Sequence, residues 1–224
     1  MKLLAIDTAT DACSAALLID RDLRERSVLA PRGHARLILP MIESLLDEAG
    51  MALAALDALA FGRGPGSFTG LRIAAGIVQG LALGADLPVV AVSDLAALAQ
   101  GAMRRHGWPA VLAALDARMG EVYWGGYVRD EAGWAVPATA EAVSPPQAVR
   151  AGRGPDWHGA GPGWAVHGPA LAAALGREVP QDAGCLPQAS DVARLAVRDF
   201  ARGAAVAADE ALPVYLRDRV AWSR

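Results

Sequence analysis

Cysteine and histidine are scarce in this chain of 224 residues, which has two cysteines and four histidines. Cys13 and Cys185 lie far apart in the sequence, which indicates a reducing, cytoplasmic location and no disulfide framework. The histidines show no metal-ligand spacing on one helix face, and no cysteine pair accompanies them. We therefore expect no metal site, and we interpret each histidine as structural or solvated: His34, His106, His158 and His167.

Long hydrophobic runs and an excess of basic charge are also missing. The most apolar stretch, 73–87, is interrupted by Asp86 and falls short of the roughly 20 residues that a membrane-spanning helix needs. The N-terminal stretch reaches Asp7 too early for a signal peptide. The net charge of −3 differs from the basic balance of proteins that hold RNA by themselves. We expect a cytoplasmic protein without a membrane partner, reaching nucleic acid only indirectly.

Apolar residues, in contrast, are abundant: they make up 54% of the chain, whose mean hydropathy is +0.27. Their pattern predicts strands that alternate with helices, and this favours an α/β architecture with mixed sheets flanked by helices in two lobes. We place the first lobe at 1–104 and the second at 105–224, and the last segment, 212–217, can pack back on the first. The predicted strands are 3–7, 13–19, 26–29, 56–61, 89–92, 111–116 and 121–128; the predicted helices are 34–49, 70–84, 93–105, 168–175 and 190–202, with a loop-rich stretch at 144–168.

The run Gly64–Arg72 joins a predicted strand to a predicted helix. Ser67 and Thr69 are suited to cap that helix, which we expect to begin near Gly70. Free N–H groups at a helix N-terminus suit a phosphate, whereas glycines equally suit a tight structural turn. The run is neither a Walker A loop nor a dinucleotide-binding GxGxxG motif.

The turn that begins with Asp7 and Thr8 follows the first predicted strand. Such a turn either holds a metal–phosphate group or bonds its own backbone, and the sequence leaves both open. Together with the glycine run it forms a candidate nucleotide- or phosphate-binding remnant: Asp7, Thr8, Gly64, Gly66, Ser67, Thr69 and Gly70. Ser67 lacks the GxSxG elbow and evident His–Asp partners, which disfavours a nucleophilic role.

A second polar turn contains Asp116, Arg118 and Glu121. These side chains could bind a polar ligand, but a solvated turn with a local ion pair is the favoured interpretation.

Six stretches, in order along nearly the whole chain, resemble the TsaB (YeaZ) family of bacterial tRNA threonylcarbamoyladenosine biosynthesis proteins. The run 64–72 and the stretch Asp116-Ala117-Arg118-Met119-Gly120-Glu121-Val122-Tyr123 are the most specific of them. The other stretches are Ala5 to Thr10 with Cys13-Ser14, His34 to Pro40, Val92 to Leu95, and Pro213 to Arg217.

The resemblance implies an actin-like, sugar-kinase-like (ASKHA) fold and a place in a complex. In that family TsaB is the partner of TsaD, which transfers a threonylcarbamoyl group to an adenosine beside the tRNA anticodon, and the ATPase TsaE joins them. TsaD holds a metal through a His-x-x-x-His pair, whereas the corresponding segment here, 91–98, has no histidine. The resemblance therefore implies a non-catalytic subunit without an intrinsic cofactor, and ATP or ADP would bind at the interface of the complex.

Two predicted helices, near 36–49 and 70–84, are apolar over more of their circumference than an ordinary surface helix. A second apolar face on each suggests burial by a partner. We expect a homodimer when the protein is alone and a heterodimer with TsaD, formed by overlapping surfaces. The predicted interface residues are Arg36, Leu39, Pro40, Leu71, Ile73, Ile77, Gly80 and Leu81.

Two other functions remain open. A stand-alone ATP-dependent kinase or ATPase of the same fold would use Asp7 and the glycine run, and 159–163 is a weak candidate for its second phosphate motif. A peptidase that depends on Ser67 is the least favoured alternative.

Overall fold

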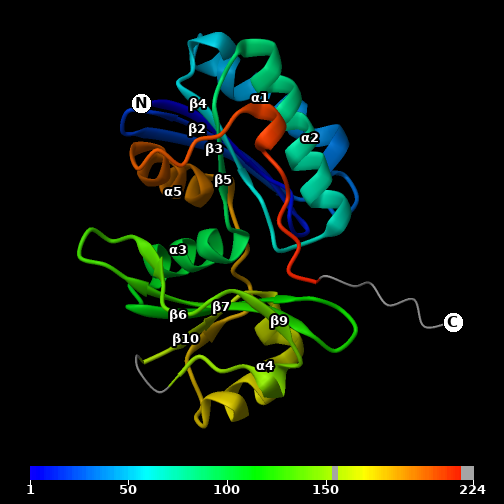
Figure 1. Cartoon of the computed structure of the whole chain (residues 1–224), viewed down its shortest axis with the longest axis vertical. Coiled ribbons are helices and arrows are strands. Elements are labelled where there is room, and N and C mark those ends of the chain that lie inside the picture. The colour runs from blue at the N-terminus through cyan, green and yellow to red at the C-terminus, as the bar shows by residue number, and fades with distance from the viewer. Residues whose placement is uncertain (153–155, 218–224) are drawn as a thin grey trace, which may run out of the picture.

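Two β-sheets, one in each lobe, organise the chain in the computed structural model, which describes residues 1–152 and 156–217 (Figure 1). The first sheet has the strand order β3-β2-β1-β4-β5. Its first three strands form an antiparallel meander, and β4 and β5 run parallel to β1, so the sheet is mixed as predicted. The strands are β1 (Lys2–Asp7), β2 (Ala12–Ile19), β3 (Asp22–Leu29), β4 (Ala58–Gly62) and β5 (Val89–Val92).

Helices cover both faces of the first sheet. Helices α1 (His34–Glu48) and α2 (Phe68–Ala85) pack on one face, where Leu4, Ile38 and Phe61 belong to one core. Helix α5 (Ala189–Ala201) covers the other face, around Leu3, Val90 and Leu195. Figure 1 shows α5 on one side of the strands and α1 with α2 on the other. The strands of this sheet are apolar on both sides because both sides are buried.

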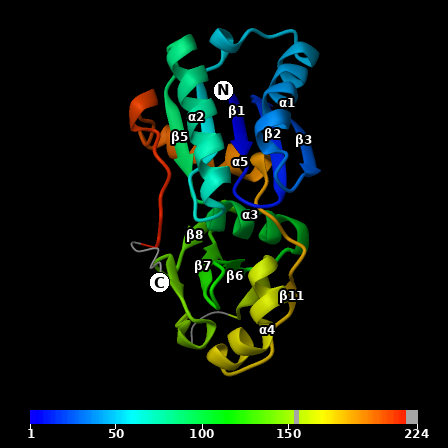
Figure 2. The ribbon, with the colours of Figure 1, turned by 90° about the vertical axis from the view of Figure 1, so that its right-hand side faces the viewer.

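The second sheet lies below the first in Figures 1 and 2 and has the order β11-β10-β6-β7-β8, with β9 also paired to β7. Helix α3 (Asp94–His106) packs on one face, and α4 (Pro162–Leu175) packs on the other. The strands are β6 (Ala110–Asp116), β7 (Val122–Arg129), β8 (Ala135–Pro137), β9 (Ala142–Ser144), β10 (His158–Ala160) and β11 (Gln181–Asp182). Short 3-10 helices occur at Leu53–Ala55, Pro146–Ala148 and Ala208–Glu210.

The lobes differ from the predicted division at residue 104. Helix α3 was assigned to the first lobe but packs on the second sheet, and α5 was assigned to the second lobe but packs on the first sheet. Residues after α5 also return to the first sheet, where Val206 bridges to Val89 beside β5. A division by residue number alone therefore does not describe the two lobes, because the chain crosses between them more than once.

One predicted helix begins earlier than the sequence suggested. Helix α4 starts at Pro162, inside the stretch interpreted as loop-rich, rather than at Gly168. Gly161 precedes it at φ 105°, and proline at the first helical position needs no N–H partner, so the start is locally consistent.

Helix α2 is longer than the apolar stretch 73–87 suggested. Its 18 residues are apolar enough that length and composition alone would let it cross a membrane. Six of them are buried, and four of these, Ala74, Ala75, Val78 and Ala82, belong to the core on the first sheet. Asp86 ends the helix as a left-handed C-cap at φ 53°.

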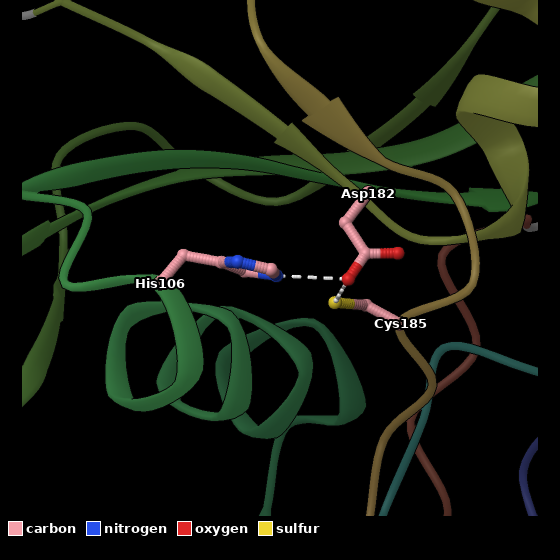
Figure 3. A group of neighbouring side chains, drawn as sticks. All are labelled: His106, Asp182 and Cys185. Carbon is pink, nitrogen blue, oxygen red and sulfur yellow. Dashed lines mark hydrogen bonds and ion pairs between the residues drawn. The ribbon is translucent and has the colours of Figure 1, made fainter.

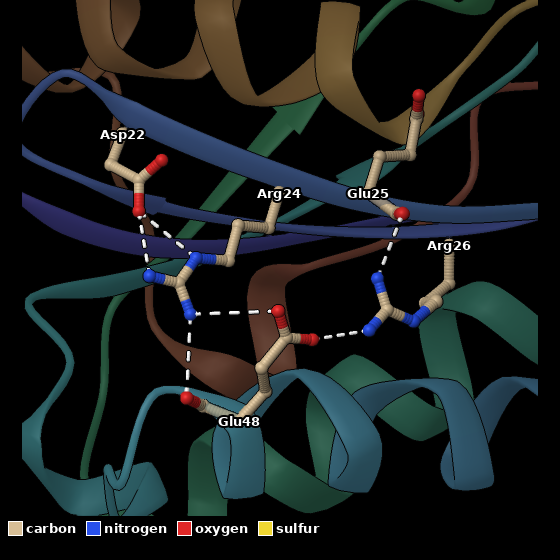
Figure 4. Close-up of polar contacts among 5 residues, drawn as sticks. All are labelled: Asp22, Arg24, Glu25, Arg26 and Glu48. Atoms are coloured by element: carbon tan, nitrogen blue, oxygen red, sulfur yellow. Dashed lines mark hydrogen bonds and ion pairs between the residues drawn. The ribbon is translucent and has the colours of Figure 1, made fainter.

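An ion-pair network ties the end of α1 to edge strand β3 (Figure 4). Arg24 lies 2.9 Å from Asp22 and 3.8 Å from Glu48, and Arg26 also contacts the Glu48 carboxylate. All four side chains are at least 35% exposed, so each pair contributes only about 0–1 kcal/mol. The network orients the edge strand rather than holding the core together.

Candidate functional site

The glycine run connects β4 to α2 and lies against the turn between β1 and β2. Ser67 is the N-cap of α2 as predicted, and its Oγ accepts a hydrogen bond from the Gly70 N–H at 3.4 Å. The backbone N–H of Ser67 donates to Ala9 O at 2.7 Å, and the Thr8 hydroxyl donates to Gly70 O at 2.8 Å. The run and the turn therefore bond to each other.

Two glycines of the run are required by this close approach. A Cβ atom on Gly66 would lie 2.5 Å from Ala9 O, and one on Gly70 would lie 2.0 Å from Thr8 O. No real Cβ reaches such distances, so only glycine lets the two segments touch. Glycine is therefore required at both positions by the close packing of the run against the turn.

Asp7 and Asp94 form a buried carboxyl pair where β1 and β5 end. Asp7 Oδ1 accepts from the Ala9 N–H at 2.9 Å, and Asp94 Oδ2 accepts from the Gly64 N–H. The other two carboxyl oxygens, Asp7 Oδ2 and Asp94 Oδ1, have no hydrogen-bond partner. Both lie close to Gly62, where an added Cβ atom would be within 2.9 Å of each oxygen. Both side chains are wholly buried, and burying two neighbouring carboxylates is costly, so each carboxyl favours its protonated form.

Burial raises the pKa of both carboxyls. The rise is larger for Asp94, to which the negative charge of Asp7 adds. Asp94 is the site residue that sequence reasoning missed, because 86 residues separate it from the turn at Thr8 and no spacing rule links them.

The C-terminal segment 211–217 crosses the glycine run. Val214 donates its N–H to Arg63 O at 2.7 Å, and its carbonyl oxygen lies 2.4 Å from where a Cβ on Gly64 would be. Tyr215 stacks near Phe68 with ring centroids 5.5 Å apart, and its hydroxyl accepts from Arg72 at 3.2 Å. We call residues 211–217 the C-terminal strap.

The strap also reaches the second lobe at the polar turn between β6 and β7. Arg217 donates to Ala117 O at 3.1 Å and pairs with the Glu121 carboxylate. Asp116 pairs with Arg118 at 3.2 Å, which is the local ion pair expected for this turn. The strap therefore connects the helix that follows the glycine run to the second sheet.

The predicted second glycine motif, 159–163, also packs against protein rather than opening toward solvent. A Cβ on Gly161 would lie 2.4 Å from Ala114 O, and one on Gly163 would lie 2.8 Å from the carbonyl carbon of Ala114. Trp164 Nε1 donates to Leu112 O at 2.9 Å and fixes the start of α4 on β6.

The four histidines are distributed over separate contacts. The ring nitrogens of His34 and His158 each bond a backbone carbonyl, that of Ala12 or Ala110, at 3.2 Å. His106 pairs with Asp182 at 2.8 Å, and His167 lies 3.6 Å from Asp116. His106 stands apart, since Cys185 also contacts its partner Asp182.

The predicted partner surface is only partly available. Its α1 members are exposed, and on α2 Gly80 is exposed while the isoleucines and Leu81 are half-buried. Leu71 is 1% exposed and contributes to the core instead, so its assignment to the surface is wrong. The members that remain accessible are Arg36, Leu39, Pro40, Ile73, Ile77, Gly80 and Leu81.

The exposed side of α2 is an apolar face with a hollow along it, which Gly76, Gly80 and Leu83 line together with residues 205–209. Gly76, Gly80 and Gly84 follow each other at four-residue spacing, and a Cβ on any of them would meet nothing within 4 Å. Phe68 and Leu83 on the same helix are 55% and 80% exposed. Glycines at this spacing allow another helix to approach closely.

Comparison with known proteins assigns the chain. A family model described as TsaD: tRNA N6-adenosine threonylcarbamoyltransferase matches residues 28–222. The protein named tRNA threonylcarbamoyladenosine biosynthesis protein TsaB from Escherichia coli is 48% identical, over the whole of this chain and 98% of its own length. The chain belongs to the TsaB (YeaZ) family.

Further relatives agree with this assignment. The TsaB protein of Haemophilus influenzae is 41% identical over the whole of this chain and 97% of its own length. The solved structure of YeaZ from Pseudomonas aeruginosa superposes with a TM-score of 0.89 at 51% identity, covering 96% of this chain and 99% of that one. The actin-like, sugar-kinase-like fold and the role in tRNA threonylcarbamoyladenosine biosynthesis that the resemblance implied are thereby confirmed.

Proposed function

We propose that this TsaB-family chain is a non-catalytic dimerisation and activating subunit of the complex that transfers a threonylcarbamoyl group to the adenosine beside the tRNA anticodon. It would bind TsaD as a heterodimer, TsaE would join the pair, and tRNA would be reached only through the complex. Alone, the chain would form a homodimer.

The closed glycine run is the observation that carries the non-catalytic part of this proposal. The N–H groups of Gly64 and Ser67 are engaged by Asp94 and Ala9 rather than turned to a ligand. Asp7 is wholly buried beside Asp94, and the strap covers Gly64. A nucleotide would have to displace these contacts, so we place ATP or ADP at the interface with a partner and assign no cofactor to this chain alone.

The exposed apolar face of α2 supports the proposed binding of a partner chain. Exposed apolar side chains and open glycines on one helix face are unusual for a surface that only meets water. The half-buried Ile73 and Ile77 contribute to this face and to the edge of the core. Burial by a second helix removes their remaining apolar area from water, at about 25 cal/mol per Å².

The same geometry weighs against a stand-alone kinase or ATPase, which requires an accessible carboxylate and free N–H groups. It weighs against a peptidase too, because the Ser67 hydroxyl serves as a helix cap. Neither alternative is favoured by a specific contact among the described residues.

The test is transfer to tRNA by purified TsaD and TsaE of the same organism, with threonylcarbamoyl-adenylate as donor, in the presence and absence of this chain. We expect modification to depend on the chain and to be retained by Ser67→Ala. Equal modification without the chain would contradict the activating role. ATP turnover by the chain alone, abolished by Ser67→Ala, would contradict its non-catalytic nature.

A further inference from the structure

Three potential metal ligands from distant parts of the sequence meet at the end of α3 (Figure 3). His106 is the last residue of that helix, Asp182 ends β11, and Cys185 lies three residues further on. Asp182 Oδ2 accepts from His106 Nε2 at 2.8 Å and from the Cys185 thiol at 3.1 Å. The three ligand atoms all lie within 4.8 Å of one another.

We propose that His106, Asp182 and Cys185 form a binding site for a divalent transition metal of the zinc class. Imidazole nitrogen, carboxylate oxygen and thiolate sulfur are the donors that zinc takes in proteins, at about 2.0–2.3 Å. Tetrahedral bonds of that length place the donors about 3.3–3.8 Å apart. The distances from Asp182 Oδ2 to His106 Nε2 and to Cys185 Sγ, now 2.8 and 3.1 Å, therefore need to lengthen by less than about 1 Å.

The ion would replace the two hydrogens that now point at Asp182 Oδ2. The thiol proton of Cys185 leaves to solvent as the thiolate binds the metal. The neutral His106 ring changes tautomer through solvent: its one proton moves from Nε2 to Nδ1, and the unprotonated Nε2 binds the metal. One proton is released for each ion bound, and no redox step is involved.

Contacts outside the cluster already position each ligand. The Gly184 N–H donates to Asp182 Oδ1 at 2.9 Å, which leaves Oδ2 for the cluster. Trp108 stacks on the His106 ring with centroids 4.2 Å apart, and Cys185 is fully buried. Such supporting contacts typically change metal affinity by about 10–100-fold.

The site is open on one side. The side chains of His106 and Asp182 are 34% and 29% exposed, so an ion can enter and water can supply a fourth ligand. The backbone carbonyls at the end of α3 present the negative end of the helix dipole, which favours a cation.

One neighbouring charge opposes the ion. Arg105 lies beside Cys185 and Asp182 and acts electrostatically on both. Burial and the hydrogen bond to Asp182 raise the pKa of the Cys185 thiol to about 12, whereas Arg105 lowers it. Affinity should therefore increase with pH, because the thiol proton must leave. The thiol and the imidazole favour zinc-like ions over Mg²⁺ or Ca²⁺, which prefer oxygen ligands.

The site has a structural consequence. Residues 181–188 lead from the second sheet to α5, which packs on the first. A metal held by this segment and by α3 would fasten the connection between the lobes. Because only the folded chain brings the ligands together, the ion would raise the melting temperature.

The test is a titration of the full chain with Co²⁺ at pH 8 under reducing conditions. We expect one ion per chain, a thiolate-to-cobalt charge-transfer band, competition by Zn²⁺ and a higher melting temperature. Cys185→Ser should abolish the band, and Asp182→Asn and His106→Gln should each weaken binding at least about 10-fold. Cys13→Ser and His167→Gln are the matched controls and should bind as the unaltered chain does, because neither residue contacts the cluster or Trp108.

A gain-of-affinity variant keeps the test decisive even if a ligand variant misfolds. Arg105→Gln removes the opposing charge and leaves all three ligands, so it should bind Co²⁺ more tightly than the unaltered chain. The proposal is overturned if the unaltered chain shows no thiolate band with excess Co²⁺, or if Cys185→Ser keeps that band.

Discussion

Asp7 and Asp94 bring two carboxyl groups together beside the Gly62 backbone, and both groups are inaccessible to solvent. Each group accepts one backbone N–H, from Ala9 or Gly64, so the pair joins the first strand, the glycine run and α3. Burial raises the pKa of both carboxyls, and this makes the junction sensitive to pH.

Asp94→Asn should stabilise the protein at neutral and alkaline pH. The pKa of both carboxyls is raised by burial, so the folded chain keeps a proton that the unfolded chain releases near pH 4. The stability from this pair is complete below that pH and falls as pH rises through the raised value. An Asn at position 94 donates to Asp7 without a titrating proton and still accepts from Gly64.

Thermal unfolding from pH 5 to pH 9 measures this effect. The variant should show a flatter pH profile and a melting temperature several degrees higher at pH 8, since each kcal/mol corresponds to about 2–4 °C for a chain of this size. Asp47→Asn, at an exposed position of α1, is the control and should leave the profile unchanged. An Asp94→Asn profile as steep as that of the unaltered chain would contradict a raised pKa of this carboxyl pair.

Gly66→Ala and Gly70→Ala should each destabilise the fold by several kcal/mol, because their Cβ atoms would collide with backbone oxygens of Ala9 and Thr8. Gly84 lies on α2, as Gly70 does, but has open space around it. Gly84→Ala should therefore stabilise the fold by about 0.5–1 kcal/mol, because alanine has the higher helix propensity. Urea unfolding compares the three. If Gly70→Ala were as stable as Gly84→Ala, the close packing of the run against the turn would be disproved.

Arg217→Ala should loosen the turn between β6 and β7, because it removes the contacts of the strap with Glu121 and Ala117. Amide hydrogen exchange at 117–121 and around Gly64 should become faster. Arg118→Ala in the same turn removes only an ion pair whose arginine is 86% exposed, and exchange should change little. Equal exchange in the two variants would mean that the strap does not couple the lobes.

Ile77→Glu and Gly80→Arg should each give a folded monomer. Both residues lie on the accessible side of α2, where a charge can meet water in the monomer but not in an apolar interface. Light scattering after size exclusion measures the mass. Val166 of α4, on the other lobe, is 58% exposed. Val166→Glu introduces the same charge as Ile77→Glu there and should leave the dimer intact. Persistence of the dimer in Ile77→Glu would remove this face from the interface.

Local signals predicted much of the fold. Short apolar runs indicated the strands of the first sheet, and Ser67 was expected to cap a helix, which its hydrogen bond from the Gly70 N–H confirms. The start of α4 was missed although Pro162 is a typical first helical residue, because the surrounding Pro, Gly and Trp residues suggested a loop.

Long-range relationships could not be predicted in this way. Neither the Asp7–Asp94 pair nor the cluster of His106 with Asp182 and Cys185 has a local spacing, because each is assembled by strands and helices far apart in the chain. The burial of Leu71 also depends on its rotation about α2 relative to Gly64, which apolar character alone does not determine.

The most direct test of the complex-subunit proposal is recovery of the tagged full chain from its own cells, with its partners identified by mass spectrometry. The unaltered chain and Val166→Glu should bring down a TsaD protein with a His-x-x-x-His pair together with a small P-loop ATPase, and Ile77→Glu should bring down less of both. Repeated recovery of the unaltered chain alone at low salt would contradict the proposed function.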